Sequence, residues 1–218
     1  VVLSNLEDFA SLELAGRVVD LLVPTTLIEN AAVVDGTGKP AFSGDLRIAG
    51  GRIAAVGELE AQPGEPVVDA RGLVLAPGFI DSHSHADGAI FEHREAVAAV
   101  SQGITTVVGG QDGESTLPLA EFFARLEAQP AAVNLASYVG HGTLRTKVMG
   151  EDFRRAASPE EVAAMAALLE PELAAGALGL STGLEYDPGI YSSTEEVVAL
   201  ARVAAARGGR YVSHIRSE

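Results

Sequence analysis

The sequence contains no cysteine among its 218 residues. Disulfide bonds and thiolate metal ligands are therefore excluded, so any bound metal must be held by histidine and carboxylate side chains. A chain without cysteine also fits a reducing compartment, because disulfide-stabilised folds belong to oxidising ones. We therefore expect a cytoplasmic location.

Positive charge is scarce as well: 15 Lys and Arg residues stand against 30 Asp and Glu residues, and the net charge is -15. A phosphate backbone is bound through clustered Lys and Arg, and no such cluster occurs, which argues against nucleic acid as a partner. The same deficit disfavours a membrane surface. Charges interrupt the apolar residues of 1–23, so we expect neither a membrane span nor a signal peptide there. Residues 1–24 are predicted to form an N-terminal extension.

The composition is otherwise that of a globular protein, with 47% hydrophobic residues and 24 glycines. Between residues 25 and 70 the sequence contains the short runs TTLIENAAVV, GDLRI, RIAAVG and PVVDA. Gly50 and Gly51 lie between the second and third runs, and a glycine turn between alternating runs is typical of a β-hairpin. Residues 25–74 are therefore predicted to form a small β domain.

From residue 73 onward the pattern changes to strands that alternate with amphipathic helices. The predicted strands are 73–81, 104–108, 132–139, 177–180 and 211–214, and the predicted helices are 91–102, 117–129, 159–175 and 194–206. Ser158 and Ser193 each precede a glutamate by three residues, which predicts a capping box at the start of two helices. Alternation of this kind is typical of an α/β fold with a parallel sheet, whose functional groups collect where the strands end.

A pair of histidines follows the first of these strands. His83 and His85 are two residues apart, so in an extended segment both side chains project from the same face and form half of a metal site. A catalytic zinc usually takes three protein ligands and keeps one position for water, so a later residue should supply at least one more. His93, in the first predicted helix, is interpreted as a surface histidine.

Other polar side chains follow the remaining strands: Asp112, His141, Tyr186, Tyr191 and His214. These residues also have structural interpretations. Aspartate is a common turn residue, a histidine between two glycines can be part of a turn, and tyrosines can pack against loops. Their coincidence at one edge of the predicted sheet favours a functional site.

Five strings in this order identify a family resemblance: PGFIDSHSHAD, GITTVVGGQDGES, YVGHGTLRTKVMG, GALGLSTGLEYDPGIYSSTEE and GGRYVSHIRSE. From about residue 25 to residue 218 the chain resembles the N-acyl-D-amino-acid deacylases (D-aminoacylases) of the amidohydrolase superfamily. The resemblance implies a metal-dependent (β/α)8 TIM barrel with a small β-sandwich-like domain. Residues 25–74 correspond to the N-terminal portion of that domain, and residues 75–218 to an incomplete barrel of five strands.

The resemblance also implies zinc, as one or two ions, with His83, His85 and His214 among its ligands. Asp112 falls where these deacylases often have a metal-binding cysteine, in a string usually like N-C-G. A carboxylate can replace a thiolate as a zinc ligand, so Asp112 is included in the expected metal site.

Two further positions resemble substrate contacts of the family. His141 is expected to touch the substrate and to polarise the scissile carbonyl, and Tyr191 is expected to contact the substrate. The general base of the family, an aspartate of the eighth strand, has no counterpart in this sequence.

The expected reaction is therefore hydrolysis of the amide bond of a small N-acyl-D-amino acid to a carboxylate and a free D-amino acid. The later strands of the family barrel have no counterpart here, so we expect this chain alone to be inactive. A C-terminal continuation or a second chain would then complete the barrel.

Three alternatives are open from the sequence. A cyclic-amide hydrolase of the same superfamily normally uses a carboxylated lysine after a later strand, whereas the only lysines here are Lys39 and Lys147 and neither ends a predicted strand. A non-catalytic or split barrel half could act as an assembly or binding module. A metal-binding or ligand-binding domain without turnover is the third alternative.

Overall fold

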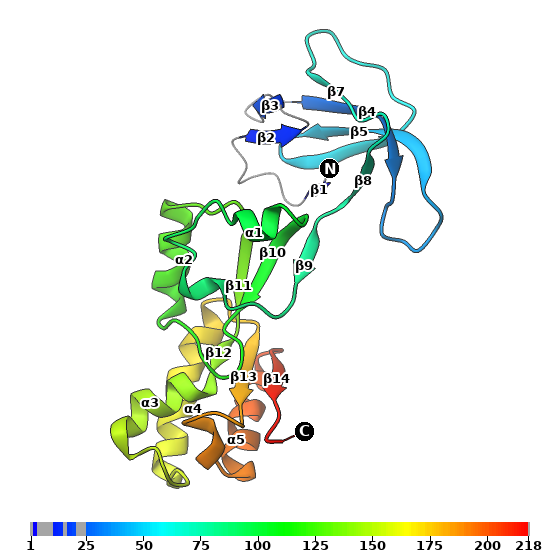
Figure 1. Cartoon of the computed structure of the whole chain (residues 1–218). Coiled ribbons are helices and arrows are strands. Elements are labelled where there is room, and N and C mark those ends of the chain that lie inside the picture. Colours follow the sequence, from blue (N-terminus) through cyan, green and yellow to red (C-terminus); the bar gives the residue numbers. More distant parts are fainter. Residues whose placement is uncertain (1, 4–10, 15–16, 21–24, 218) are drawn as a thin grey trace. The chain divides into compact units, whose positions relative to one another are not determined.

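The computed structural model describes residues 2–3, 11–14, 17–20 and 25–217 (Figure 1). The chain divides into two compact units, which comprise residues 1–80, 95–106 and 131–134 in the first, and residues 81–94, 107–130 and 135–218 in the second. The domain limits at 24 and 74 stay predictions, and most of the predicted extension, 1–24, lies outside the described residues. No helix in the described ranges is long and apolar enough to cross a lipid bilayer.

The first unit contains a six-stranded sheet. Its strands, in spatial order, are β1 (Val2–Leu3), β8 (Val74–Pro77), β4 (Thr25–Val33), β5 (Phe42–Ala49) and β6 (Arg52–Gly57), while β7 (Val67–Asp69) pairs with β4. Strands β4, β5 and β6 are antiparallel neighbours, which confirms the predicted hairpin. Gly50 and Gly51 have φ angles of 55° and 72°, a left-handed conformation that glycine adopts without steric cost.

Alternate residues of this sheet build one apolar core, as expected when one face of a strand is buried. The core consists of Ile28, Ala31, Val33, Leu46, Ile48, Ala70 and Leu75. A separate antiparallel pair is formed by β2 (Ser11–Leu14) and β3 (Arg17–Asp20).

Two three-stranded sheets contain the strands predicted after residue 73. Their orders are β11 (Asn134–Ser137), β10 (Ile104–Gly109), β9 (Phe79–Asp81) and β12 (Val139–Gly140), β13 (Gly179–Gly183), β14 (Arg210–His214). The second sheet is parallel throughout. Tyr138 separates β11 from β12, so the strand predicted at 132–139 is divided between the two sheets. The strand predicted at 73–81 is divided as well, into β8 and β9, which belong to different sheets. The order of the predicted strands is thus confirmed, but their number is not, because two of the five are each split in two.

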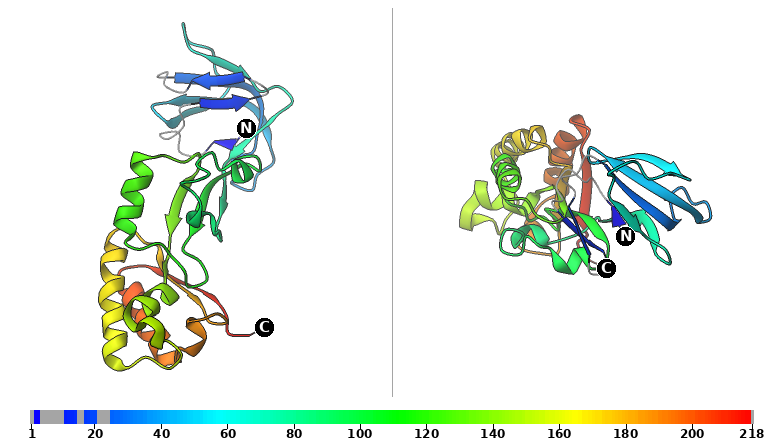
Figure 2. Two further views of the ribbon diagram at one scale, coloured as in Figure 1. Left: turned by 60° about the vertical axis from the view of Figure 1, so that its left-hand side comes forward. Right: turned by 90° about the horizontal axis from the view of Figure 1, so that it is seen from above.

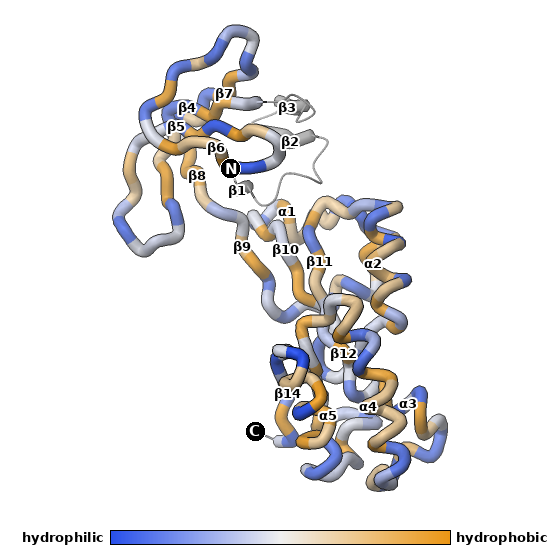
Figure 3. The backbone as a smooth tube through the Cα atoms, turned by 180° about the vertical axis from the view of Figure 1, so that it is seen from behind, coloured by the Kyte–Doolittle hydropathy of each residue, from blue (hydrophilic) through white to orange (hydrophobic). Residues whose placement is uncertain are grey.

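Helices connect these strands: α1 (Val97–Val100), α2 (Leu119–Ala128), α3 (His141–Met149), α4 (Pro159–Ala174) and α5 (Thr194–Ala206). Helix α4 packs against α3 and α5, and α5 packs against β13 and β14 (Figure 2). Apolar and polar segments alternate along α2, whose buried residues are Leu119 and Phe122 (Figure 3). Helices α3, α4 and α5 pack against the strands of the parallel sheet, and the strand ends and the loops that follow them are left to form a site.

Two helix predictions were wrong. The helix predicted at 91–102 shrinks to the four residues of α1, and it starts after Ala96, whose φ of 43° is left-handed and interrupts any helix. Helix α3 was not predicted, because its buried residues include His141 and Arg145. A helix that buries polar side chains has no apolar periodicity for a sequence pattern to detect.

One predicted capping box is complete and the other is half formed. The Ser158 hydroxyl accepts from the Glu161 N–H (3.2 Å), and the Glu161 carboxylate accepts from the Ser158 N–H (2.7 Å). The Ser193 hydroxyl accepts from the Glu196 N–H (3.1 Å), but the Glu196 carboxylate turns instead to side chains of α3. The second capping box therefore lacks the hydrogen bond from the Ser193 N–H to the Glu196 carboxylate, because that carboxylate binds α3.

Candidate metal centre and adjoining pocket

The two histidines of the H-x-H motif lie just after β9 rather than within it. The Asp81 carboxylate accepts from the His83 N–H (3.2 Å) and bends the chain as the strand ends. The next N–H, of Ser84, donates to the carbonyl of Val108 in β10 (3.0 Å), which fixes the segment to the neighbouring strand. Both imidazoles nevertheless reach one point, because the Nε2 atoms of His83 and His85 lie 3.1 and 3.2 Å from Oδ2 of Asp112.

Asp112 lies in the loop after β10 and has a φ of 52°, a left-handed conformation that is uncommon outside glycine. The loop is held at the next residue, where the Gly113 N–H donates to Ser181 Oγ (3.2 Å) and the Gly113 carbonyl accepts from the Thr143 N–H (3.1 Å). A Cβ atom at Gly183 would collide with the Asp112 carbonyl oxygen, so the backbones of the loop and β13 are in direct contact. Asp112 is thus fixed by packing from two sides.

This group fits a zinc ion. One ligand atom from each of His83, His85 and Asp112 lies within 4.8 Å of the others, and two nitrogens with one carboxylate oxygen are a common zinc donor set. Bonds of about 2.0–2.1 Å at tetrahedral angles place ligand atoms about 3.3 Å apart. The separations of 3.1 and 3.2 Å approach that spacing. The histidine side chains are 56% and 61% exposed, so the site is open to water.

His214, the further predicted ligand, ends β14 and does not join this group among the described residues. Its Nε2 lies 3.0 Å from Oε2 of Glu185, and the Tyr186 hydroxyl lies 3.1 Å from its Nδ1. The Tyr186 and His214 rings are stacked at a tilt with centroids 4.6 Å apart. A metal-binding role of His214 stays a prediction.

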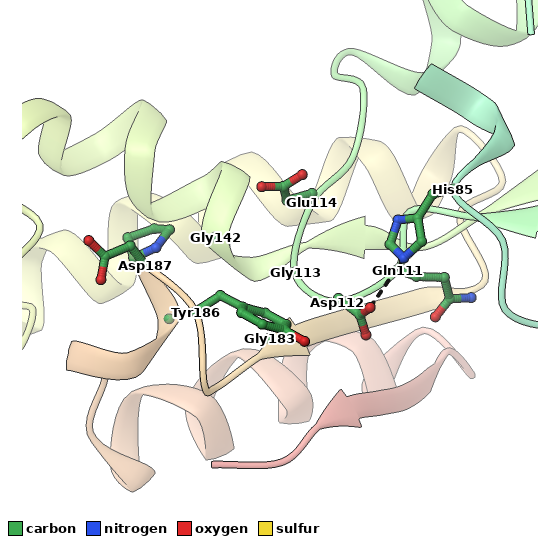
Figure 4. Close-up of a pocket in the computed structure, with 11 residues that line it drawn as sticks. His85, Gln111, Asp112, Gly113, Glu114, Gly142, Gly183, Tyr186 and Asp187 are labelled. Atoms are coloured by element: carbon green, nitrogen blue, oxygen red, sulfur yellow. Dashed lines mark hydrogen bonds and ion pairs between the residues drawn. The ribbon is translucent and has the colours of Figure 1, made fainter. Parts of the chain in front are cut away.

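A cavity of about 290 Å³ adjoins Asp112 and His85, and its wall includes Gln111, Glu114 and Tyr186. Figure 4 shows the Asp112 carboxylate facing His85 and the Tyr186 ring extending toward Asp112. The sequence placed Tyr186 among the polar residues that follow predicted strands, but it predicted no specific role for Tyr186 or Glu114. Glu114 follows a predicted strand too, and that placement is the signal that could have selected it.

A second cavity, of about 540 Å³, shares His85 and Glu114 with the first. Its wall also contains hydroxyl side chains, among them Thr143 and Thr146 of α3, and the ammonium group of Lys147. The two cavities therefore adjoin the same histidine, and together they offer room for a small polar molecule beside the candidate metal centre.

His141 is placed differently from the prediction. Its side chain is 0% exposed and lines neither cavity, and its Nε2 lies 2.8 Å from Oε1 of Glu196. Arg145 donates to both oxygens of Glu196 and, through Nη2, to the carbonyls of Phe153 and Arg155. A fully covered imidazole cannot touch a substrate in this arrangement, so these contacts favour a structural role over carbonyl polarisation.

The buried position of Glu196 has an electrostatic consequence. Burial raises the pKa of the Glu196 carboxyl, but the hydrogen bonds from His141 and Arg145 outweigh it, so the pKa lies below its ordinary value. The carboxylate therefore stays ionised and holds α3 to α5.

Tyr191 also lies away from both cavities. It belongs to the short helix η4 (Gly189–Tyr191), and its ring centroid is 6.1 Å from that of Phe153. Its predicted substrate contact has no support from this placement, whereas Tyr186, five residues earlier, lines the smaller cavity. His93 is exposed, as predicted.

Comparison with known proteins gives close similarities. Residues 66–213 match the profile of the Amidohydrolase family. The N-acyl-D-aspartate deacylase of Alcaligenes xylosoxydans xylosoxydans is 44% identical over 216 residues, which cover 88% of this chain and 43% of that protein. The chain spans less than half the length of the relatives described here.

Two solved structures are similar over the same part of the chain. The N-acyl-D-glutamate deacylase from Bordetella bronchiseptica, complexed with zinc and a phosphonate inhibitor that mimics the tetrahedral intermediate, is 40% identical with a TM-score of 0.85. A D-aminoacylase studied for its binuclear metal centre is 39% identical with a TM-score of 0.83. Each match covers 88% of this chain and 45% of the other.

Proposed function

The chain belongs to the amidohydrolase family, and from that membership we propose that it is part of a zinc-dependent hydrolase that cleaves the amide bond of N-acyl-D-amino acids. The observation that carries the proposal is the convergence of His83, His85 and Asp112 at one point beside a cavity. The proposal also draws on three relatives of the chain that are named as deacylases or aminoacylases. Their sequence identities to this chain are nearly equal.

The proposed fold of the complete protein is a (β/α)8 TIM barrel with a small β-sandwich-like domain. Strands β9, β10, β11 with β12, β13 and β14 follow one another in chain order, as neighbouring strands of such a barrel do. On this proposal residues 75–218 supply five barrel strands, and residues 25–74 supply part of the smaller domain. Because the relatives are more than twice as long as the matched region, we propose that further sequence or a second chain supplies the remaining strands.

The proposed metal site uses His83, His85 and Asp112, with His214 as a further ligand on the strength of its motif, and takes one or two zinc ions. Bound zinc supplies a Lewis acid for the amide carbonyl and makes a water molecule acidic enough to ionise near neutral pH. The two imidazoles would hold the ion through Nε2, the atoms that face Asp112, and the Asp112 carboxylate would lower the positive charge of the site. The Tyr186 ring lines the adjoining cavity and limits its width.

The substrate is proposed to occupy the two adjoining cavities. Water adds to the amide carbonyl carbon, the C–N bond breaks, and a proton passes to the departing nitrogen, which gives a carboxylate and a free D-amino acid. The hydroxyl groups of Thr143 and Thr146 and the ammonium group of Lys147 can hydrogen-bond polar parts of the substrate.

The test uses the full-length protein that contains this chain. We expect the wild type to bind zinc and to release amine from N-acetyl-D-amino acids but not from their L-enantiomers. The double variant His83→Ala/His85→Ala should lose bound zinc and turnover together. His93→Ala is the matched control, because this histidine is exposed in the same segment and lies outside the ligand group. Turnover retained by the double variant would refute the proposal.

A further inference from the structure

Gln111 immediately precedes Asp112 and is only 2% exposed. Its Nε2 donates to the carbonyl of Ser82 (3.0 Å) and to the carbonyl of Val108 (3.2 Å). A buried polar side chain with such partners is costly to disturb, because loss of the amide leaves two carbonyls without these donors.

The orientation of this amide follows from its partners. Both neighbours are carbonyl oxygens, which only accept hydrogen bonds, and the NH₂ group of a glutamine has two donors. The amide oxygen in that position would face two other oxygens. Nε2 is therefore the atom that joins the two carbonyls.

These two carbonyls belong to the segments that position the histidines. Ser82 is bonded directly to His83 in the chain, and the Val108 carbonyl also accepts from the Ser84 N–H (3.0 Å). The glutamine amide thus ties the residue before His83 to the end of β10, and the residue after His83 is tied to the same Val108 carbonyl by its own N–H. The same residue begins the Asp112 loop, since the Gln111 carbonyl accepts from the Glu114 N–H (3.0 Å) and closes the turn.

We propose that Gln111 is a positioning residue that sets the distance between the Nε2 atoms of His83 and His85 and the carboxylate of Asp112. This inference rests on the metal site of the proposed function. The backbone of Asp112 is left-handed at a φ of 52°, a conformation that must be held by its surroundings in a residue other than glycine. Gln111 is the residue before Asp112 in the chain, and its side chain is bonded to the segment that carries the two imidazoles. It can therefore hold the Asp112 backbone in place relative to that segment.

The geometry separates Gln111 from the ligands themselves. Its amide nitrogen donates to the carbonyls of Ser82 and Val108, and a protonated amide nitrogen has no lone pair to offer a metal ion. Its effect on metal binding is therefore indirect: the ligands stay present in a Gln111 variant, but their separation is no longer fixed. Residues that orient metal ligands in this way typically change metal affinity about 10- to 100-fold when replaced.

The test compares variants of the full-length protein that differ in this amide. Gln111→Leu keeps most of the side-chain volume and removes both donors, and Gln111→Asn keeps both donors on a shorter side chain. Gln129→Leu is the matched control, because Gln129 is exposed at the end of α2. Zinc affinity is measured by competition with a chromogenic chelator, the ligand geometry by the visible spectrum of the Co²⁺ form, and folding by thermal unfolding of the metal-free protein.

We expect Gln111→Leu to bind zinc about 10- to 100-fold more weakly and to change the Co²⁺ spectrum, with no such change in Gln129→Leu. Should Gln111→Leu fail to fold, Gln111→Asn provides the same test, since the shorter side chain cannot reach both carbonyls. Wild-type affinity and an unchanged spectrum in a folded Gln111 variant would overturn this inference and leave the proposed function intact. A wild type that binds no zinc would overturn both.

Discussion

Arg145 on α3 and Glu196 on α5 form an ion pair whose side chains are 0% and 1% exposed. Both oxygens of the Glu196 carboxylate lie 2.6 Å from Nη1 of Arg145. The same carboxylate also binds His141, the first residue of α3, so the ion pair fixes the start of this helix. The second residue of α3, Gly142, lines both cavities. A buried charge pair of this kind is expected to determine how α3 lies on α5.

Replacing Glu196 with glutamine should destabilise the fold strongly. Glu196→Gln keeps the shape of the side chain but leaves the Arg145 guanidinium buried without its counter-charge. Removal of one partner of a buried ion pair costs about 3–5 kcal/mol, and we expect a loss of that size in the free energy of unfolding. Urea denaturation of the full-length protein at neutral pH measures it.

Glu195→Gln is the matched control for this experiment. Glu195 precedes Glu196 on the same helix but is exposed, so its neutralisation should change the free energy of unfolding by no more than about 0.5 kcal/mol. An equal effect of the two substitutions would show that the buried pair has no special role.

The lowered pKa of the Glu196 carboxyl also predicts how stability depends on pH. A carboxyl whose pKa is lower in the folded than in the unfolded state stabilises the fold fully above the unfolded value, which is 4.5 here. That contribution is lost as the pH falls below 4.5 and through the folded-state pKa. Glu196→Gln should therefore flatten the acid side of the stability curve. Unfolding free energies measured at a series of acidic pH values test this, and curves that remain parallel would contradict it.

The sequence predicted the strands well because their signals are local. In the first unit, alternate residues such as Leu46 and Ile48 enter one core, and glycines mark the hairpin turn. The convergence of His83 and Asp112 could be anticipated for a similar reason, since both follow strands whose ends meet at one edge.

The polar interior could not be predicted in the same way. Helix α3 buries His141 and Arg145, and these side chains interrupt the apolar pattern that identifies a helix. The role of Glu196 depends on a contact 51 residues away in the sequence, which no local pattern encodes. The partner of His214 is a similar case, because Glu185 reaches it from a different strand end.

A methyl group at Gly183 should disturb the candidate metal centre from the backbone side. The Cβ atom of Gly183→Ala would meet the Asp112 carbonyl oxygen, and Gly183 is buried in β13, so this strand cannot simply move into solvent. Overpacking of this kind costs about 1–3 kcal/mol, and we expect that loss in the free energy of unfolding. Because Asp112 is the residue displaced, zinc affinity should fall as well, whereas a purely structural defect would lower stability alone.

Gly88→Ala is the control that separates these effects. A Cβ atom at Gly88 meets no atom within 4 Å, and this residue lies in the short helix η2 (Ala86–Gly88) directly after the two histidines. The substitution should therefore leave both unfolding and zinc affinity nearly unchanged, although it is close to the same site. If Gly183→Ala also left zinc affinity unchanged, the contact between β13 and the Asp112 loop would have no part in positioning the Asp112 carboxylate.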